Sequence, residues 1–276
     1  MTTIAWIDGR WGPPADLSLP LSDRGLQLAD GLFETVLIEV GQPRLLREHL
    51  QRWQEGAALL GLQAPPAIET LEPLIAEAID RSPEGAACGA LRLNWSRGEI
   101  ADPQASRGIG LPKANAPQPQ PRFWLQLTPI QLDFRAITAI VSRQEQRNAS
   151  SQLSRCKTFA YNQAIAARRE AQACGADDAL LLSSGGGLSC GSTANLLVQR
   201  QGRWLTPPLS SGCLPGIMRR RSLELGLAEE TPLQAQPQPG DHWLLINSLG
   251  CRPLRQLDGQ LLPTIPAAEE LWRSLL

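Results

Sequence analysis

The chain has 276 residues, of which 42% are hydrophobic and 19% charged, and its formal net charge is −1. A chain of this length and composition suits a globular protein with one large domain or two smaller ones. The near-neutral charge gives no reason to expect nucleic acid or an anionic membrane as a partner.

The first residues include no basic segment followed by a long apolar run, and no apolar run elsewhere approaches the length that spans a bilayer. We therefore expect neither a signal peptide nor a membrane span. The six cysteines form no C-x-x-C pair, and the only histidines are His49 and His242, so a structural zinc site is not expected. Scattered thiols in such a chain indicate a reducing compartment, and we predict a cytoplasmic protein.

Hydrophobic patterning in the first 111 residues predicts a mixture of strands and helices. Apolar residues recur at helical spacing from Arg47 to Leu60, and Gly61 ends the pattern. On this helix His49 and Arg52 are three positions apart and share a face. The predicted strands are residues 4–7, 33–40 and 90–95, and the predicted helices are residues 47–60 and 71–80.

A proline-rich segment, residues 112–121, interrupts this pattern. Four of its ten residues are proline, which opposes helix and central strand and favours an extended linker. We predict that it separates an N-terminal domain, residues 1–111, from a C-terminal domain, residues 122–276.

The second part of the chain also mixes helices and strands. Residues 158–174 are rich in alanine and stop at Gly175, which predicts a helix, and Pro215 and Gly216 precede a second predicted helix at residues 217–225. Strands are predicted at residues 136–141, 179–182, 194–198 and 242–246, with a glycine turn at residues 185–187 between the second and the third. The complete pattern indicates the α+β fold class.

Lysine is rare in this chain, occurring only at Lys113 and Lys157 among 26 lysine and arginine residues. Unlike arginine, lysine carries an amine that can lose its proton and attack a carbonyl carbon. A helix that began near Lys157 would place Tyr161, the only tyrosine, on the same face. These residues alone also fit a surface lysine beside a packed tyrosine, so the choice depends on more distant segments.

Several distant segments of the chain form a recognisable series. They are residues 23–25, 29–35, 49–52, 96–98, 157–161, 175–179, 192–195, 206–207, 214–219 and 247–250. Their order and spacing resemble the class IV aminotransferase family, which uses pyridoxal 5′-phosphate (PLP). The resemblance extends from about residue 4 to residue 255, and no single motif decides it.

This resemblance implies a two-domain fold-type-IV PLP enzyme like D-amino-acid aminotransferase, with a small N-terminal α/β domain and a larger, β-barrel-like C-terminal α/β domain. It also implies a homodimer. Within the family, the chain looks most like 4-amino-4-deoxychorismate lyase. Asn247, Ser248 and Leu249 stand where the aminotransferase branches usually have a Gly-Thr or Ser-Thr pair, and Met218 stands where other branches often have threonine.

The resemblance also assigns roles to individual residues. Lys157 would form a Schiff base with the aldehyde of PLP and move protons at the substrate carbon, and amides at a helix N-terminus would bind the phosphate. The residues assigned to cofactor binding are Arg52, Lys157, Tyr161, Cys190, Asn195, Ile217, Met218 and Ser248. Substrate carboxylates require an arginine fork, for which Arg97 and Arg107 are the candidates. Taken singly, Arg52 also fits a solvated charge and Met218 a core residue, so only the joint pattern favours a site.

One position departs from the family pattern. The family has a glutamate after the glycine turn that keeps the cofactor ring nitrogen protonated, and this chain has Cys190 there. A neutral thiol cannot stabilise a pyridinium as a carboxylate does. Three accounts fit: the chemistry needs little carbanion stabilisation, another carboxylate enters, or the chain is a weakened paralogue.

The resemblance thus implies a PLP-dependent lyase that converts 4-amino-4-deoxychorismate to 4-aminobenzoate and pyruvate, a step toward folate. The first alternative is an aminotransferase for D- or branched-chain amino acids. The second is a non-catalytic chain that binds PLP or an anion, for which Cys190 is the support. The expected partner is a small molecule with carboxylates, neither nucleic acid nor a membrane.

Overall fold

The computed structural model describes residues 2–100, 109–111 and 119–276 of the chain. It divides into two compact units. The first unit contains the chain up to Gln131 together with Lys157–Ala160, and the second contains Leu132–Cys156 and Tyr161–Leu276. None of the helices in the described part of the chain is long and apolar enough to cross a membrane.

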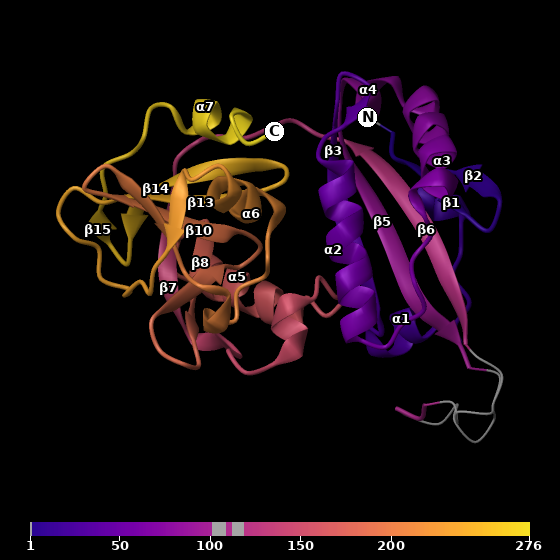
Figure 1. Ribbon diagram of the computed structural model, residues 1–276, viewed down its shortest axis with the longest axis horizontal. Helices are drawn as coiled ribbons and strands as arrows, with labels where there is room; N and C mark the ends of the chain where they lie inside the picture. Colours follow the sequence, from indigo (N-terminus) through magenta and orange to yellow (C-terminus); the bar gives the residue numbers. More distant parts are fainter. Residues whose placement is uncertain (1, 101–108, 112–118) are drawn as a thin grey trace. The chain divides into compact units, whose positions relative to one another are not determined.

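The first unit is built on a six-stranded antiparallel sheet in the order β2-β1-β6-β5-β3-β4 (Figure 1). Its strands are β1 (Ile4–Ile7), β2 (Arg10–Gly12), β3 (Gly31–Glu39), β4 (Gln42–Pro43), β5 (Cys88–Glu99) and β6 (Gln120–Pro129). Its helices are α1 (Arg24–Leu28), α2 (Leu46–Leu59), α3 (Ile68–Arg81) and α4 (Pro83–Ala87), with a 3-10 turn at Pro14–Asp16. The three strands and two helices that hydrophobic periodicity predicts in this unit are confirmed, although β5 extends beyond the predicted strand at both ends.

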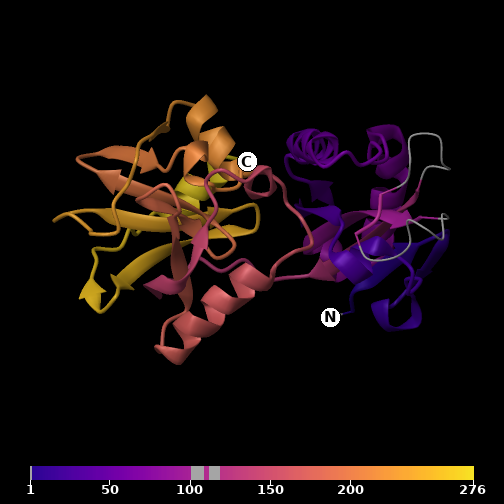
Figure 2. The same cartoon turned by 90° about the horizontal axis from the view of Figure 1, so that it is seen from below.

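One face of this sheet carries the core of the unit because apolar side chains alternate along its strands. Leu32, Val36, Leu91 and Leu93 are fully buried on this face, and each such side chain contributes roughly 1.5–3 kcal/mol. Helices α2 and α3 lie on the same side of the sheet in both ribbon views (Figures 1 and 2). Helix α2 approaches closely at Gly56, where a Cβ atom would lie 3.3 Å from a Leu32 methyl carbon.

The division between the units falls later than the sequence predicts. Strand β6 pairs with β5 over most of its length and with β1 on its other side, so the chain after the proline-rich segment returns to the first sheet. The predicted domain boundary at residues 112–121 is therefore wrong; residues 112–118 themselves lie outside the described part of the chain.

The second unit is built on a nine-stranded sheet that curls around its own core (Figure 1). The strand order is β12-β11-β10-β13-β14-β7-β8-β9, with β15 beside β14. Leu180, Leu196, Trp243 and Leu254 belong to the buried cluster of this sheet. This arrangement confirms the β-barrel-like C-terminal fold.

The second unit contains strands β7 to β15 and helices α5 to α7. Its strands are β7 (Ile137–Arg147), β8 (Asp178–Ser183), β9 (Leu188–Gly191), β10 (Asn195–Arg200), β11 (Arg203–Thr206), β12 (Ala228–Glu230), β13 (His242–Asn247), β14 (Gly250–Leu257) and β15 (Gln260–Leu261). Its helices are α5 (Asn162–Ala173), α6 (Ile217–Glu224) and α7 (Ala268–Arg273), with 3-10 turns at Gln152–Arg155 and Leu209–Ser211.

Two predictions for this part of the chain are wrong in detail. The helix predicted at residues 158–174 begins only at Asn162, because residues 157–160 are extended and lie along the edge of β3. The glycine turn at residues 185–187 joins β8 to β9, a strand that is not predicted from the sequence, and β10 follows as a separate strand. Strand β9 has only four residues, too few to reveal a period.

Gly31 allows residues 157–160 to approach β3. A Cβ atom at this position would lie 2.2 Å from the Phe159 ring and 2.7 Å from the Trp95 carbonyl oxygen. We predict that Gly31→Ala destabilises the first unit by about 1–3 kcal/mol, the usual cost of overpacking. Gly12→Ala is the matched control in urea denaturation, because its nearest neighbour atom is 3.8 Å away. Equal losses of stability in the two variants would contradict this prediction.

Candidate active site

Lys157 belongs to the extended segment that pairs with the edge of β3 in the first unit. The amide of Phe33 donates a hydrogen bond to the Lys157 carbonyl at 2.9 Å, and the amide of Phe159 donates to the Gly31 carbonyl at 3.1 Å. Leu32 and Thr158 are antiparallel partners. This register places Lys157 opposite Phe33, so the two side chains lie on the same face of the sheet, opposite to the core.

Phe33 is the centre of a group that we call the Lys157 face: Lys157, Phe33, Arg92, Asn94, Trp124 and Phe159. Strand pairing puts Phe33 beside Asn94, and Asn94 beside Trp124. The Lys157 amine lies 4.3 Å from the centroid of the Phe33 ring, and the guanidinium carbon of Arg92 lies 3.5 Å from the same centroid. The Phe159 ring stacks on Phe33 with 6.3 Å between centroids. The amine of Lys157 therefore lies at an aromatic surface that a second cation also covers.

Arg52 and His49 share the buried face of α2, as predicted, and both reach Glu34 of β3. Arg52 donates from Nε to Glu34 Oε1 at 2.8 Å and from Nη2 to Oε2 at 2.5 Å, and His49 Nδ1 lies 2.7 Å from Oε2. Glu34 and His49 are each 1% exposed. Burial alone would raise the pKa of Glu34. The charge of Arg52 and the hydrogen bond with His49 have the larger combined effect and lower the pKa of Glu34 to about 2. Burial lowers the pKa of His49 below 6.5, so His49 is neutral beside a buried Glu34–Arg52 ion pair.

The Glu34–Arg52 bond fixes the plane of the Arg52 guanidinium, since two parallel hydrogen bonds leave it little freedom to rotate. His49 has the role of a hydrogen-bonded core histidine, and it carries no chemistry in our interpretation. Neither Glu34 nor Arg92, which lies beside Lys157, is among the site residues predicted from the sequence.

Arg97 holds the end of α2. Its Nε donates to Asp30 Oδ2 at 2.8 Å, its Nη1 to the Gly61 carbonyl at 2.8 Å, and its Nη2 to the Leu60 carbonyl at 3.0 Å. All three nitrogens bind acceptors within the first unit, and a cation is favoured at the C-terminal end of a helix. We therefore interpret Arg97 as a structural residue. The other candidate for the substrate, Arg107, lies outside the described residues.

In the second unit, α6 begins after Gly216, and no side chain caps its first turn. Asn195 donates from Nδ2 to the Leu214 carbonyl at 2.9 Å and so holds the loop that precedes the helix. A Cβ atom on Gly216 would lie 1.9 Å from Asn195 Oδ1, so this close approach requires glycine. The structure thus brings Asn195 next to the first amides of α6, those of Ile217 and Met218, and such an uncapped end suits an anion.

Ser248 lies in the turn between β13 and β14. Asn247 of this turn donates from Nδ2 to the Thr193 carbonyl at 3.5 Å, so the turn neighbours the loop that leads to Asn195. Tyr161 is the N-cap residue of α5. Because α5 starts after Tyr161, Lys157 and Tyr161 do not share a helical face, and that prediction is wrong.

Cys190 lies on β9 opposite Leu181 and is 7% exposed. It belongs to an apolar cluster with Ala167 and Ala171 of α5 and with Cys213. Burial raises the pKa of the Cys190 thiol to about 11. The residue that replaces the family's glutamate is therefore a neutral, buried thiol at physiological pH.

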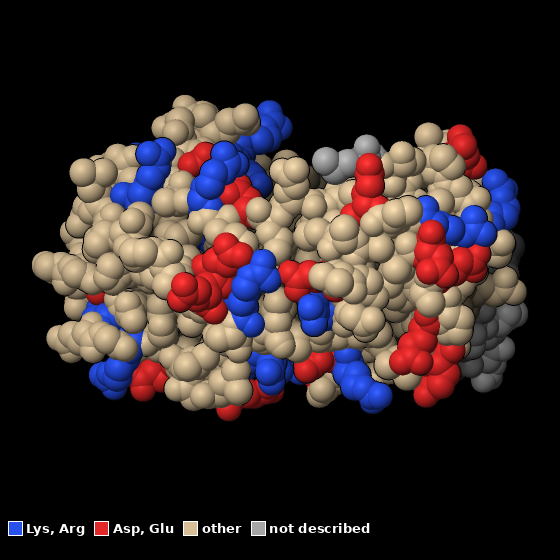
Figure 3. Space-filling view, turned by 90° about the horizontal axis from the view of Figure 1, so that it is seen from above, with Lys and Arg blue, Asp and Glu red and all other residues tan. Residues whose placement is uncertain are grey.

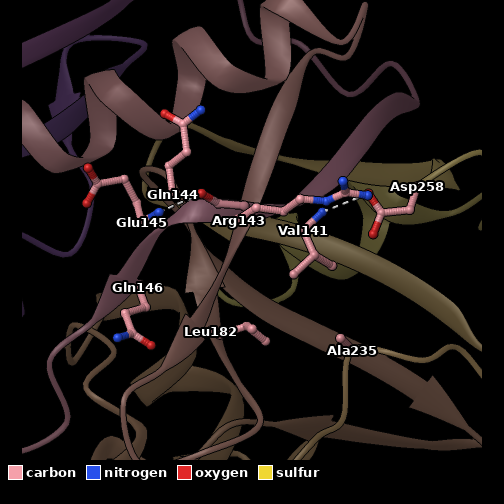
Figure 4. A pocket seen from close by; sticks show the side chains of 9 residues that line it. Val141, Arg143, Gln144, Glu145, Gln146, Leu182, Ala235 and Asp258 are labelled. Carbon is pink, nitrogen blue, oxygen red and sulfur yellow. Dashed lines mark hydrogen bonds between the residues drawn. The ribbon is translucent and has the colours of Figure 1, made fainter.

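A depression of about 470 Å³ opens in the second unit beside β7, where the pairing of β7 with β8 is irregular (Figure 4). Val141, Leu182 and Ala235 line it together with Asp258 and residues 142–146. Asp258 accepts a hydrogen bond from the Val141 amide at 3.1 Å. No site residue predicted from the sequence lines this depression, and we assign it no role in the chemistry.

Acidic and basic side chains are interspersed on the face of the molecule that Figure 3 shows. Many described charges form ion pairs, including Arg200 with Asp241 and Arg203 with Glu229 in the second unit. Charge is thus locally balanced, in keeping with the net charge of −1.

The architecture of the two units is that of the fold-type-IV PLP enzymes. The chain is similar to a hypothetical aminotransferase from Mycobacterium tuberculosis solved in a PLP-bound form, with a TM-score of 0.81 and 23% identity over 99% of this chain and 96% of that chain. Residues 31–257 match the family model described as Amino-transferase class IV. The chain belongs to the class IV aminotransferase family.

Relatives of this chain carry the names of more than one activity. It is 25% identical over 298 residues to a bifunctional aminodeoxychorismate lyase / D-amino acid transaminase from Mycobacterium tuberculosis, covering 96% of this chain and 95% of the relative. It is 26% identical over 230 residues to a D-alanine aminotransferase from Bacillus licheniformis, covering 79% and 73%. Membership of the family therefore leaves lyase and aminotransferase activities as the two candidates.

The cofactor is PLP. In the first unit, Lys157 has the amine that its aldehyde would need. In the second unit, the uncapped N-terminus of α6 has amides that would suit its phosphate. At Cys190 a neutral thiol would hold a ring proton less well than the carboxylate that the resemblance implies there.

Proposed function

We propose that this protein is a PLP-dependent lyase that converts 4-amino-4-deoxychorismate to 4-aminobenzoate and pyruvate. The observation that carries this proposal over an aminotransferase is the buried neutral thiol of Cys190. Transamination depends on a protonated cofactor ring that accepts a full negative charge, and a thiol supports such a ring poorly. Elimination of pyruvate depends on it less, because the product ring becomes aromatic.

Lys157 moves the protons in the proposed reaction. When bound, PLP supplies an electron-withdrawing ring conjugated to the substrate nitrogen. Once the substrate amine has taken its place at the cofactor, the freed Lys157 amine would remove a proton from the substrate ring. The bond between the ring carbon and the ether oxygen breaks, the side chain leaves as pyruvate, and the ring becomes 4-aminobenzoate. Lys157 returns the proton to the departing group.

The remaining site residues bind and orient in this proposal. The amides of Ile217 and Met218, the hydroxyl of Ser248 and the guanidinium of Arg52 hold the phosphate, whose two negative charges favour amides and a cation. Asn195 supports this role by fixing the loop before α6. Tyr161 lies near the cofactor ring.

The test is a coupled assay for pyruvate and 4-aminobenzoate, starting from enzymatically made aminodeoxychorismate with PLP added. We expect both products in equal amounts. Absence of both products at high enzyme concentration would refute the lyase proposal.

The second candidate is an aminotransferase for D- or branched-chain amino acids, which the names of several relatives favour. Incubation with pairs of amino and keto acids separates the two candidates, because only the aminotransferase forms a new amino acid. A weakened paralogue would bind PLP and show its visible absorption but convert none of these substrates.

Cys190 provides a prediction that compares the two reactions within one protein. We predict that Cys190→Glu accelerates the half-transamination of an amino acid, because a carboxylate holds a proton on the cofactor ring. Rapid mixing with D-alanine, followed by cofactor absorbance, measures the rate. Cys213→Ser is the control for a polar substitution in the same cluster. A wild-type rate equal to or above that of Cys190→Glu would contradict the prediction.

We also propose a cytoplasmic homodimer, as the resemblance implies. Light scattering after size exclusion gives the molar mass of the particle in solution. A mass equal to that of one chain would refute the dimer.

A further inference from the structure

We infer that Arg147 keeps the cofactor ring nitrogen free of a proton and so directs this protein away from transamination. This role rests on the proposed function in one respect, namely that Cys190 stands at the ring nitrogen, as the resemblance implies. Arg147 and Cys190 both belong to the second unit. Arg147 is not among the site residues predicted from the sequence.

Strand register puts Arg147 and Cys190 on one face of the curled sheet. Arg147 of β7 pairs with Ser183 of β8, and Cys190 of β9 pairs with Leu181 of β8. Ser183 and Leu181 are two residues apart, and alternate residues of a strand project from the same face. Arg147 and Cys190 therefore share the face that α5 covers with its part of the apolar cluster.

Two hydrogen bonds hold the Arg147 guanidinium at this face. Its Nε donates to the Gly212 carbonyl at 3.2 Å, and its Nη1 donates to Gln163 Oε1 of α5 at 3.3 Å. Gly212 precedes Cys213, which belongs to the same apolar cluster as Cys190. Within the described part of the chain, no residue accepts a hydrogen bond from Nη2, so this group is available to a bound molecule.

Two opposite charges act on Cys190. Burial raises the pKa of its thiol to about 11, and the positive charge of Arg147 partly opposes that rise. Asp178 of β8 acts in the other sense, but its carboxylate already accepts three hydrogen bonds. The donors are Ser192 Oγ, the Ala179 amide and Arg168 Nη2. The loop before α6 adds the thiol of Cys213, whose pKa burial also raises. The cation beside Cys190 is thus available, whereas the carboxylate is committed elsewhere.

A guanidinium at the ring nitrogen has a direct consequence for protonation. A pyridine nitrogen becomes positively charged when it takes up a proton, and a neighbouring cation opposes that second positive charge. A guanidinium donates hydrogen bonds and accepts none, so it pairs with the lone pair of an unprotonated nitrogen and not with a pyridinium N–H. A ring without this proton withdraws electrons less strongly. This disfavours transamination and agrees with an elimination whose product ring becomes aromatic.

Solid-state NMR of PLP that carries ¹⁵N in its ring tests this role in the PLP-loaded protein, because protonation moves the signal far upfield. The PLP aldimine of a simple amine in solution gives the reference signals of both forms. We expect an unprotonated nitrogen in the wild type at neutral pH. Arg147→Gln should raise the pKa of the nitrogen by about 1–3, the usual effect of one nearby charge. Arg147→Lys keeps the charge and should leave this pKa close to the wild-type value.

Arg143→Gln is the matched control for loss of a cation. Arg143 is an exposed residue of the same strand and lines the depression shown in Figure 4. Its replacement should leave the pKa of the ring nitrogen unchanged.

A protonated ring nitrogen in the wild type at neutral pH would overturn the inference. An unchanged pKa in Arg147→Gln would overturn it too. An equal rise in Arg147→Gln and Arg147→Lys would also do so, because Arg147 would then act by holding the loop before α6 and not by its charge. If Arg147→Gln fails to fold, Arg147→Met, which keeps the apolar stem, takes its place, and the wild-type signal decides if neither folds. The pyruvate assay is separate: absence of pyruvate refutes the reaction, whereas a protonated nitrogen in a protein that forms pyruvate refutes only the role of Arg147.

Discussion

Replacing Lys157 by arginine should abolish the release of pyruvate and 4-aminobenzoate while the fold persists. Arginine keeps the positive charge above the Phe33 ring, so the packing of the Lys157 face changes little. A guanidinium does not give up its proton, however, and so it can neither bond to the cofactor aldehyde nor carry a proton to the substrate carbon. Loss of the proton transfer alone corresponds to about 10²–10⁴-fold in rate. The coupled pyruvate assay measures the effect.

The chain offers an unusually clean control for this substitution, because Lys113 is its only other lysine. Lys113→Arg should retain wild-type turnover. Reduction of the PLP-loaded protein with borohydride, followed by peptide mass spectrometry, should label Lys157 in the wild type and in Lys113→Arg, and nothing in Lys157→Arg. Wild-type turnover in Lys157→Arg, or a label on another residue of the wild type, would contradict the assignment.

Local periodicity predicts those elements that bury one face against a neighbour. In α2, Leu50, Trp53 and Ala57 recur at helical spacing because all three are buried, and their pattern suffices to place the helix. Strands β6 and β14 are missed because both contain proline, which lowers strand propensity although the strands pair. The prolines are Pro121 and Pro129 in β6 and Pro253 in β14. Strand pairing here is decided by tertiary contacts that a sequence window does not contain.

The same limit applies to the candidate site. The rarity of Lys157 is visible in the sequence, but its neighbours Phe33 and Arg92 come from strands far away in the chain, and only register brings them together. The error at residues 158–161 has this cause as well, since pairing with β3 outweighs the helical preference of the following alanines. Glu34, in contrast, could be predicted. A carboxylate within an apolar strand requires a buried partner, and His49 and Arg52 on one helical face provide it.

Replacing Glu34 by glutamine should destabilise the first unit by about 3–5 kcal/mol, the usual cost of removing one partner of a buried ion pair. The substitution preserves the shape of the side chain but leaves the Arg52 charge buried without its carboxylate. Hydrogen exchange of the β3 amides reports on the first unit alone and measures this loss. Glu55→Gln removes a carboxylate from the exposed side of the same helix and should cost no more than about 0.5 kcal/mol.

The pH dependence of stability distinguishes this ion pair from simple packing. The pKa of Glu34 is lowered from 4.5 to about 2 in the folded chain, so its contribution is complete above pH 4.5 and is lost as the pH falls toward 2. The pKa of His49 is also lowered, from 6.5, so a further loss of stability begins below pH 6.5. We therefore expect the protection of β3 in the wild type to decline on acidification, and the decline between pH 4.5 and pH 2 to be reduced in Glu34→Gln. An equally steep decline in that variant would show that other carboxylates cause the loss of stability in acid. The charge of Glu34 would then add nothing to stability, and Glu34 would support Arg52 through packing alone.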